Sequence, residues 1–335
     1  MQNILDLLSE FGRKVDPIII KYLKNGAYAD FVPAALYQIK SGGKRVRSAL
    51  TLLSCKAVNG KISEAIFPAA IFELIHNYSL IMDDIIDRGE VRRGVPTTRS
   101  KFGDDIALLA GMFYREVIGD IIGECNNGDK IQELVIRTIK ETIEGERLDI
   151  LFEQIGKTGE YIEHHRFKTI SNKSYQKLIG KKTATLMSAA CRAGAIVSDA
   201  SQKREKALSD YGWYLGLTFQ ITDDILDIFG EKTGKQRGKD IIEHKLGNAI
   251  IMLAFQEMNE STKMKLLNIL RKPKVDQTSV KKAIRLIEIT NAQESAYKLA
   301  NKYAEKSKKI LLILPESKAR RRLCDLADFI VNRLY

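Results

Sequence analysis

Apolar residues recur at intervals of three and four along most of this 335-residue chain, and strict alternation of apolar and polar residues is hard to find. The first pattern is typical of amphipathic helices, and the second is typical of half-buried strands. The sequence therefore predicts an all-α protein. Among the predicted helical stretches are an amphipathic first helix at residues 1–16 and two apolar stretches at residues 69–87 and 212–229.

Short loops are predicted where glycine, asparagine and proline gather. They lie at residues 25–26, 41–44, 88–96, 125–130, 156–161, 230–240 and 272–277. None of these loops is long enough to link two domains, and no proline interrupts the stretch between Pro96 and Pro273. We therefore expect residues 1–335 to form a single large helical domain, although the chain exceeds the usual domain size.

Composition narrows the class of protein. Hydrophobic residues make up 44% of the chain, which is ample for a large core. The four cysteines lie far apart without a CxxC pair, which argues against a disulfide framework or a cysteine zinc site and favours a reducing cytoplasm. No apolar run approaches the roughly 20 residues that span a bilayer, and the N-terminus does not resemble a signal peptide. We expect a cytoplasmic protein without an integral membrane segment.

The net charge is +12, from 54 lysines and arginines against 42 acidic residues. It indicates an anionic partner, and by itself it leaves open nucleic acid, anionic lipid and a phosphorylated metabolite. The basic residues between 271 and 309 are interpreted as the solvent-facing sides of late helices. Few aromatic residues lie among them, so a stacking platform for nucleic acid gains little support.

One five-residue pattern occurs twice, as DDIID at residues 83–87 and as DDILD at residues 223–227. Each copy ends an apolar helical stretch, so its first and third carboxylates share a helix face. Like charges at this spacing cost a helix a few tenths of a kcal/mol per pair, which favours a bound cation. An all-oxygen ligand set is typical of Mg²⁺. The alternative is a pair of solvated acidic helix ends.

Basic residues gather beside both acidic clusters. Arg92 and Arg93 follow the first copy, and Lys235, Arg237, Lys239 and Lys245 follow the second. A third group, GGKRVR at residues 42–47, begins with two glycines and could hold a second anion. Metal ions and guanidinium groups together neutralise a diphosphate. Taken singly, each basic group is also consistent with an ordinary solvated surface.

On these motifs the chain resembles, over nearly its full length, the trans-isoprenyl diphosphate synthases, which join allylic diphosphates to isopentenyl diphosphate. The matching motifs are GGKRVR at 42–47, ELIH at 73–76, the first Asp-rich motif with its RRG at 83–94, GERLD at 145–149, KTA at 182–184 and GLTFQITDDILD at 216–227. The resemblance implies a helical bundle around a central cavity, with three Mg²⁺ per active site and a homodimer.

The resemblance also implies roles for individual residues. Most of the Mg²⁺ coordination would fall to Asp83, Asp87 and Asp223, supported directly or through water by Asp84, Asp224 and Asp227. The allylic diphosphate would be held by Arg92, Lys182 and Lys235, with Lys245 a further candidate. The isopentenyl diphosphate would be held by Lys44, Arg47, His76 and Arg93. His76 lies two helical turns before Asp83 and so faces the same side, although a lone histidine on a helix is usually structural.

The implied mechanism is ionisation followed by condensation. Mg²⁺ and cationic side chains would stabilise pyrophosphate as it leaves, giving an allylic carbocation in a pocket from which water is kept. The isopentenyl double bond attacks this cation, and loss of a proton completes the head-to-tail product. Thr183 and Gln220, beside Lys182, would stabilise the cation through their dipoles.

Product length is predicted from depth along the helix that precedes the first Asp-rich motif. Ser79 lies about 6 Å below Asp83 and leaves room, Tyr78 lies about 7.5 Å below and flanks the path, and Phe72 lies about 16 Å below and can act as a floor. A floor at that depth suits geranylgeranyl diphosphate, with farnesyl or geranylfarnesyl diphosphate as alternatives. Both aromatics could instead be ordinary core residues.

Several positions depart from the family pattern. Ser48 stands where proline is common, Arg99 stands where histidine is frequent, and Leu109 to Met112 replace the usual LAGD. The GKxT pattern becomes HKLGN at residues 244–248, so the assignment of Lys245 is less secure than that of Lys235. None of these changes removes a predicted metal ligand.

Three alternatives fit the motifs less well. An α-helical terpene cyclase generally lacks both the second DDxxD and GGKRxR. A non-catalytic partner subunit would be expected to lose an Asp-rich motif, and neither is lost. A basic nucleic-acid-binding module would leave the acidic clusters unexplained, because without metal they repel phosphate.

Overall fold

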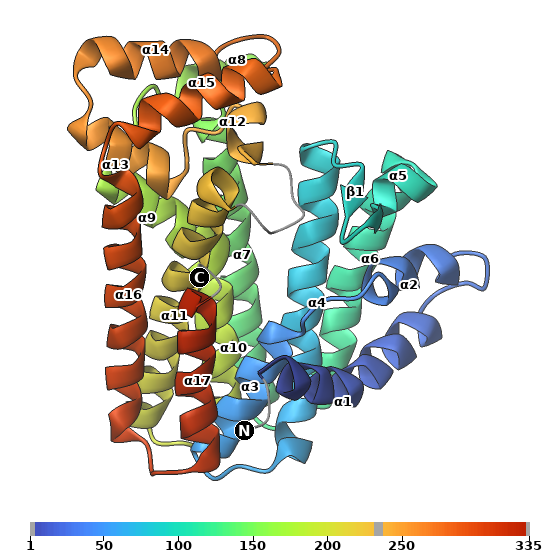
Figure 1. Cartoon of the computed structure of the whole chain (residues 1–335). Helices are drawn as coiled ribbons and strands as arrows, with labels where there is room; N and C mark the ends of the chain where they lie inside the picture. The colour runs from blue at the N-terminus through green and yellow to red at the C-terminus, as the bar shows by residue number, and fades with distance from the viewer. Residues whose placement is uncertain (1–3, 231–236, 333–335) are drawn as a thin grey trace. The chain divides into compact units, whose positions relative to one another are not determined.

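The structure is a computed structural model of the chain that describes residues 4–230 and 237–332 (Figure 1). Its α-helices are α1 (Ile4–Asn25), α2 (Val32–Lys40), α3 (Val46–Ala57), α4 (Ile62–Ile86), α5 (Thr98–Phe102), α6 (Asp104–Ile122), α7 (Gly128–Phe152), α8 (Glu160–His165), α9 (Asn172–Ile179), α10 (Thr185–Ile196), α11 (Gln202–Phe229), α12 (Lys239–Ile242), α13 (Ala249–Glu257), α14 (Glu260–Leu270), α15 (Gln277–Glu288), α16 (Ala292–Ile310) and α17 (Lys318–Asn332). A π-helical turn, η1 (Gly180–Ala184), and a 3₁₀ turn, η2 (Leu311–Ile313), complete the helical part. The all-α prediction is confirmed.

The predicted first helix ends too early, and the stretch predicted at residues 69–87 begins too late. Helix α1 continues through Pro17 to Asn25, and α4 starts at Ile62 and continues through Pro68. A proline inside a helix removes one backbone hydrogen bond, but both helices bury apolar side chains on either side of the proline. Packing of these faces outweighs the lost hydrogen bond.

The predicted loop at residues 88–96 contains a small hairpin, which the sequence analysis missed. Strands β1 (Val91–Arg92) and β2 (Val95–Pro96) pair antiparallel, with Arg92 opposite Val95. The two connecting residues, Arg93 and Gly94, have φ values of 57° and 79°. Positive φ at both positions is the requirement of a type I′ turn, which suits a two-residue hairpin loop.

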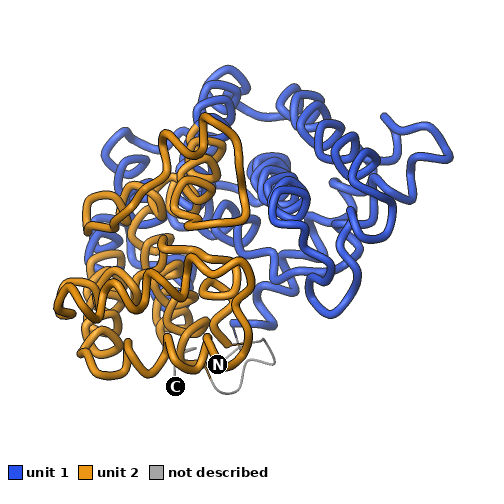
Figure 2. Tube along the Cα trace, turned by 90° about the horizontal axis from the view of Figure 1, so that it is seen from above, with its two compact units in different colours: residues 1–140, 186–212, 308–326 blue, residues 141–185, 213–307, 327–335 orange. Residues whose placement is uncertain are grey.

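The described residues group into two compact units, coloured separately in Figure 2. Unit 1 is drawn from residues 1–140, 186–212 and 308–326, and unit 2 from residues 141–185, 213–307 and 327–335. Each unit therefore combines three separate segments of chain. The expectation of a single domain stays a prediction.

Unit 1 is organised around α4. This helix packs against α1, α3 and α6, and α10 approaches α3 so closely that a Cβ on Gly194 would lie 2.3 Å from the carbonyl oxygen of Thr51. By length and composition α4 could cross a bilayer, but 61% of its apolar window is buried inside the structure. That burial is typical of a core helix.

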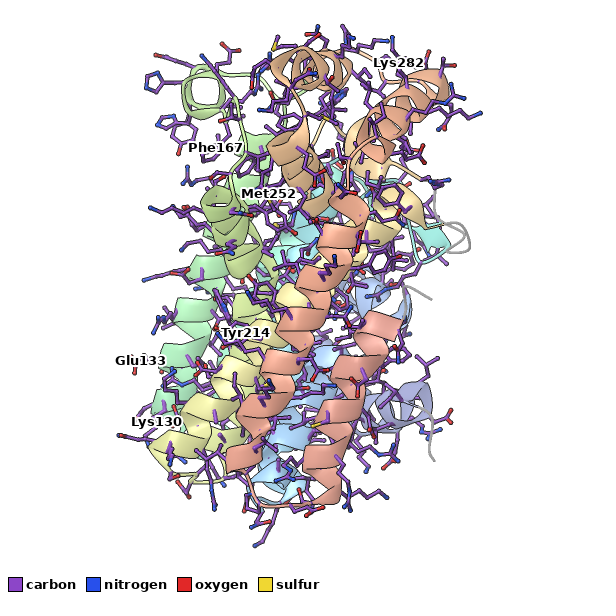
Figure 3. All side chains as sticks on the ribbon, turned by 60° about the vertical axis from the view of Figure 1, so that its left-hand side comes forward. Lys130, Glu133, Phe167, Tyr214, Met252 and Lys282 are labelled. Carbon is purple, nitrogen blue, oxygen red and sulfur yellow. The ribbon has the colours of Figure 1, made fainter. Side chains whose placement is uncertain are left out.

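Unit 2 has its own hydrophobic core, formed by α9, α11, α13, α14, α15 and the start of α16 together with the end of α7. Phe152 and Phe167 stack in it, with ring centroids 4.2 Å apart. The basic residues of α15 face solvent, as predicted: Lys281, Lys282 and Arg285 are exposed, and Figure 3 shows Lys282 pointing away from the helix.

Candidate active site

The first Asp-rich motif lies at the end of α4, in unit 1. Asp83 and Asp84 belong to the last turn of the helix, and Asp87 is its C-terminal cap. Arg92, on strand β1, reaches back to this turn. Its Nε lies 2.8 Å from Asp84 Oδ2, and its Nη2 lies 2.8 Å from Asp84 Oδ1 and 3.1 Å from Asp83 Oδ2. The guanidinium thus forms a bidentate ion pair with Asp84 and a single hydrogen bond with Asp83.

The hairpin turn brings Arg92 into this position. The backbone amide of Gly89 donates to the carbonyl of Asp84 at 2.8 Å, and the Thr97 hydroxyl donates to the carbonyl of Gly89 at 2.7 Å. The chain therefore reverses directly after α4. The predicted Asp-rich motif and the RRG that follows it thus form a single structural unit.

The glycine-rich motif at residues 42–47 is held by its buried arginine, Arg45. Arg45 has a φ of 53° and donates to Asp16 at 2.6 and 3.1 Å and to the carbonyls of Gly42 and Ile39 at 2.9 and 3.0 Å. Arg93 also donates to the carbonyl of Gly42. These contacts hold in place the loop before α3, on which Lys44 lies.

The unusual Ser48 has a structural reason. Its backbone amide and its hydroxyl both lie within hydrogen-bond distance of Glu73 Oε2, at 3.3 and 3.2 Å. A proline at this position has no amide hydrogen to donate. The serine therefore links α3 to the ELIH motif on α4.

His76 lies among arginines in unit 1. Its pKa is lowered well below 6.5, first by burial and then by the positive charges of Arg47, Arg93, Arg92 and Arg45. The imidazole is therefore neutral at neutral pH. The structure also brings together three of the four side chains predicted to hold isopentenyl diphosphate, namely His76, Arg47 and Arg93. Lys44 is exposed on the loop before α3.

The residues predicted to set product length all lie on α4. Phe72 is fully buried, and Tyr78 and Ser79 are partly buried. The Ser79 hydroxyl donates to the carbonyl of His76 at 2.8 Å, so it is satisfied within the helix. Their role in product length stays a prediction.

In unit 2, the KTA motif forms the π-helical turn η1 between α9 and α10. A π turn inserts an extra residue into a helix and is frequent at functional sites. Glycines allow the close packing around this turn. A Cβ on Gly145 would lie 2.3 Å from the backbone nitrogen of Lys182, and a Cβ on Gly180 would lie 2.8 Å from Cη2 of Trp213.

Asp149, from the GERLD motif, joins two of the predicted diphosphate-binding lysines. Its Oδ2 lies 2.7 Å from Lys182 Nζ and 3.2 Å from Lys245 Nζ. Although burial opposes ionisation, the two ammonium groups hold the pKa of Asp149 well below its usual value. Lys182 also pairs with Glu146 at 2.9 Å, and Lys245 with Glu243 at 3.2 Å.

The second Asp-rich motif lies near the end of α11, also in unit 2. Asp224 Oδ2 accepts from the Tyr175 hydroxyl and from the backbone amide of Ala249, both at 2.7 Å. Its Oδ1 accepts from Gln220 Nε2 at 2.9 Å, and Gln220 Oε1 accepts in turn from the Thr183 hydroxyl at 2.7 Å. The two predicted cation-stabilising residues are therefore in direct contact.

Asp227 binds the start of α12. Its two carboxylate oxygens accept from the backbone amides of Lys239 and Asp240 at 2.9 and 3.2 Å. Burial and the charge of Asp240 raise the pKa of both Asp224 and Asp227 to about 8. These two carboxylates of the second motif therefore hold their protons more tightly than ordinary aspartates do.

A pocket in unit 2 collects these side chains. It is lined by Asp149, Lys182, Gln220, Asp224, Asp240 and Lys245, among others. Lys235 lies outside the described residues. Within residues 4–230 and 237–332, no group of three or more histidine, cysteine, aspartate or glutamate side chains could hold a metal ion.

Sequence reasoning assigned no role to Asp149, Tyr175, Asp240 or Arg45. Asp149 ends a motif that matched the family, which was an available signal. Tyr175 and Asp240 carry no such signal, because their importance depends on contacts with Asp224 and Asp227 in the fold.

Comparisons with known proteins identify the family of the chain. The polyprenyl synthetase profile matches residues 30–287. A short chain isoprenyl diphosphate synthase of Methanothermobacter thermautotrophicus is 34% identical over 99% of both chains, and a geranylgeranyl pyrophosphate synthase of Geoglobus acetivorans is 32% identical over 98% of this chain and 99% of its own. The crystal structure of geranylgeranyl pyrophosphate synthetase from Pyrococcus horikoshii has a TM-score of 0.88, with 32% identity and 98% of each chain covered. The chain belongs to the polyprenyl synthetase family.

Proposed function

We propose that this protein is a Mg²⁺-dependent prenyltransferase that condenses isopentenyl diphosphate head-to-tail with allylic diphosphates to make geranylgeranyl diphosphate. One observation carries the proposal: each of the two Asp-rich motifs lies beside its own cationic residues, Arg92 at the first and the Lys182–Lys245 pair near the second. Relatives named as short-chain and geranylgeranyl diphosphate synthases support the same class of reaction.

The donor set of the motifs fits Mg²⁺. Every predicted ligand is a carboxylate oxygen, the donor that this ion prefers. In the proposal Asp83, Asp87 and Asp223 bind three Mg²⁺ directly, and Asp84, Asp224 and Asp227 support them. The bound ions would supply electrostatic stabilisation to the leaving pyrophosphate.

The two diphosphates are assigned to different side chains. Arg92, Lys182, Lys235 and Lys245 bind the allylic diphosphate, and Lys44, Arg47, His76 and Arg93 bind isopentenyl diphosphate. Because His76 is neutral, it contributes a hydrogen bond rather than a charge, and the arginines around it carry the electrostatic attraction. The carboxylate of Asp149 pairs with both Lys182 and Lys245 and so holds their ammonium groups close together.

Thr183 and Gln220 act on the carbocation. The Thr183 hydroxyl donates to Gln220 Oε1, so the remaining lone pairs of both oxygens are available to face positive charge. Fixed dipoles of this kind stabilise charge that develops in a transition state without having to reorganise.

The product length rests on α4. Phe72 is buried eleven residues before Asp83, at the depth expected of a floor for a twenty-carbon chain. Tyr78 would narrow the path above it and favour farnesyl diphosphate if it leaned across. A deeper floor would give geranylfarnesyl diphosphate.

We further propose a cytoplasmic homodimer. Helix α6 exposes a row of apolar side chains at helical spacing, with Leu108, Leu109 and Met112 each 45–56% exposed. A contiguous apolar surface of this kind marks an interaction site. Analytical ultracentrifugation of the full chain, compared with a Leu109→Glu variant, tests the dimer.

The function is tested by incubating the purified protein with isopentenyl diphosphate and an allylic diphosphate, with and without Mg²⁺. Pyrophosphate release and the mass of the extracted lipid are the readouts. We expect Mg²⁺-dependent release and a twenty-carbon product. Release from the allylic substrate alone, with a cyclic hydrocarbon as product, would instead show a terpene cyclase.

A further inference from the structure

Asp224, in the second Asp-rich motif, accepts three hydrogen bonds from described residues. Its side chain is buried, and its two oxygens accept from three neutral donors: the Gln220 amide, the Tyr175 hydroxyl and the Ala249 backbone amide. All three contacts lie between 2.7 and 2.9 Å. A carboxylate oxygen that already accepts such hydrogen bonds has less lone-pair capacity for a metal ion.

The contact with Gln220 fixes which way the amide points. An amide carries a donor end and an acceptor end. The NH₂ end of Gln220 donates to Asp224 Oδ1, and its Oε1 is turned toward Thr183. The Thr183 hydroxyl must then donate to this oxygen. The result is a chain of hydrogen bonds with one polarity.

The far end of the chain is anchored by the fold. Tyr175 comes from α9, Ala249 is the first residue of α13, and Asp224 lies on α11. Burial and the neighbouring Asp224 raise the pKa of Tyr175 well above 10, so its hydroxyl keeps its proton as a donor. Asp224 therefore cannot rotate without losing contacts to two other helices.

We propose that Asp224 is a positioning residue for Gln220 and Thr183, anchored by Tyr175, and that it does not ligate Mg²⁺. The inference rests on the proposed function, because it states how the two cation-stabilising oxygens acquire their orientation. The two Asp-rich motifs then differ in use: the second aspartate of the later motif sets the polarity of a hydrogen-bond chain.

The proposal predicts what an isosteric change does. In Asp224→Asn, the new amide keeps its oxygen toward Tyr175 and Ala249 and presents its NH₂ group to Gln220. The amide of the new asparagine and the NH₂ group of Gln220 are then two donors facing each other, so the Gln220 amide flips. Its NH₂ group now donates to the Thr183 oxygen, and the Thr183 hydroxyl rotates its hydrogen away. Donors rather than lone pairs would face the carbocation.

The test compares four proteins: wild type, Asp224→Asn, the exchange variant Asp224→Asn/Gln220→Glu, and Asp223→Asn. The exchange restores an acceptor at position 220 for both the new amide at position 224 and the Thr183 hydroxyl, and it keeps one negative charge in the pair. We expect kcat of Asp224→Asn to fall about 10²-fold, which is typical of a lost preorganised dipole, and the exchange variant to recover at least about tenfold of that loss.

Metal binding is measured separately from turnover. Calorimetric titration of inorganic pyrophosphate in the presence of Mg²⁺ should give an affinity for Asp224→Asn within about threefold of wild type, whereas Asp223→Asn loses at least about tenfold. A loss for Asp224→Asn as large as for Asp223→Asn, full turnover in Asp224→Asn, or no recovery in the exchange variant would each overturn the proposal.

A conservative variant guards against misfolding. Tyr175→Phe keeps the ring and removes one donor to Asp224, and kcat should fall about fivefold with unchanged pyrophosphate affinity. Unchanged kcat in this variant also counts against the anchor. A wild-type protein without activity would refute the proposed function, while the pyrophosphate titrations would still report whether Asp224 binds metal.

Discussion

The two Asp-rich motifs have nearly the same sequence and different surroundings. In the first, Asp84 is paired with the guanidinium of Arg92, and in the second, Asp224 accepts from three neutral donors among the described residues. The pKa of Arg92 is raised by Asp84 and Asp83 against the opposing effect of burial, whereas burial and Asp240 raise the pKa of Asp224 to about 8. The second aspartate of the repeated sequence therefore lies in two different electrostatic environments.

The comparison shows that position within a motif is not enough to assign a role. Asp84 balances a cation that we assign to the allylic diphosphate, and Asp224 orients an amide. The first aspartate of each motif is where we expect the two copies to act alike. Variants can separate these cases.

The largest effect is expected where the motifs should behave alike. Asp83→Ala and Asp223→Ala should each lower turnover by several orders of magnitude, because each removes a proposed metal ligand that stabilises the leaving group. The melting temperature should change little or rise, since repulsion between neighbouring carboxylates is relieved. Retention of more than about a tenth of wild-type turnover at saturating Mg²⁺ would refute the ligand assignment, because one strong electrostatic contact is worth about 10².

The next effect separates the second aspartates. Arg92→Gln removes the guanidinium that is paired with the buried Asp84, and we expect a loss of about 2 kcal/mol in the free energy of unfolding. Tyr175→Phe removes one neutral hydrogen bond from Asp224 and should cost about 1 kcal/mol. Urea denaturation of the metal-free proteins measures both. Arg92→Lys is the control, since it keeps the positive charge without the bidentate guanidinium contact. Equal losses for Arg92→Gln and Tyr175→Phe would contradict the contrast between a charged partner at Asp84 and neutral partners at Asp224.

Product length should depend on the helix of the first motif only. Replacing both Tyr78 and Phe72 by alanine should lengthen the product by at least one five-carbon unit, because it removes the floor below Asp83. Thr218, five residues before Asp223 as Tyr78 is before Asp83, gives the matched control on α11. Mass analysis of the extracted product should show no change for Thr218→Ala. An unchanged product in the double variant would place the floor elsewhere.

The smallest effect concerns the pH dependence of stability that arises from His76, which lies among the arginines of unit 1. The pKa of folded His76 lies well below 6.5, its ordinary value, so the unfolded chain binds the proton more readily. Stability from this group is complete above about pH 6.5 and is lost as the pH falls toward the folded pKa. The unfolding free energy of wild type should therefore fall, relative to His76→Gln, between about pH 7.5 and about pH 5.5. A constant difference across that range would show that neither burial nor the arginines lower the pKa of His76.

Much of the fold was predictable because it depends on local pattern. The loops at residues 41–44 and 88–96 lie where glycine and proline break the helical pattern, and both Asp-rich motifs end long helices. The starts of α4 and α11 were not predicted, because packing carries α4 through Pro68 and α11 begins ten residues before the predicted stretch at Gly212. The hairpin was missed because each of its strands has only two residues.

The site was predictable in its residue types and not in its connections. The aspartates and lysines are visible in the sequence, but Lys182 and Asp149 are 33 residues apart, and Tyr175 and Asp224 are 49 apart. Which of these side chains pair depends on how separate helices pack. Ser48 shows the same limit, since its contact with Glu73 joins two helices and explains why proline is absent.

The chain contains a single tryptophan, and it lies against the π-helical turn of the KTA motif. Gly180, which contacts the indole of Trp213, begins the same five-residue turn that holds Lys182 and Thr183. The tryptophan fluorescence of the protein therefore reports from one place, within a few residues of groups assigned to both the diphosphate and the carbocation. Binding kinetics at this turn can be followed by stopped flow on the unlabelled protein.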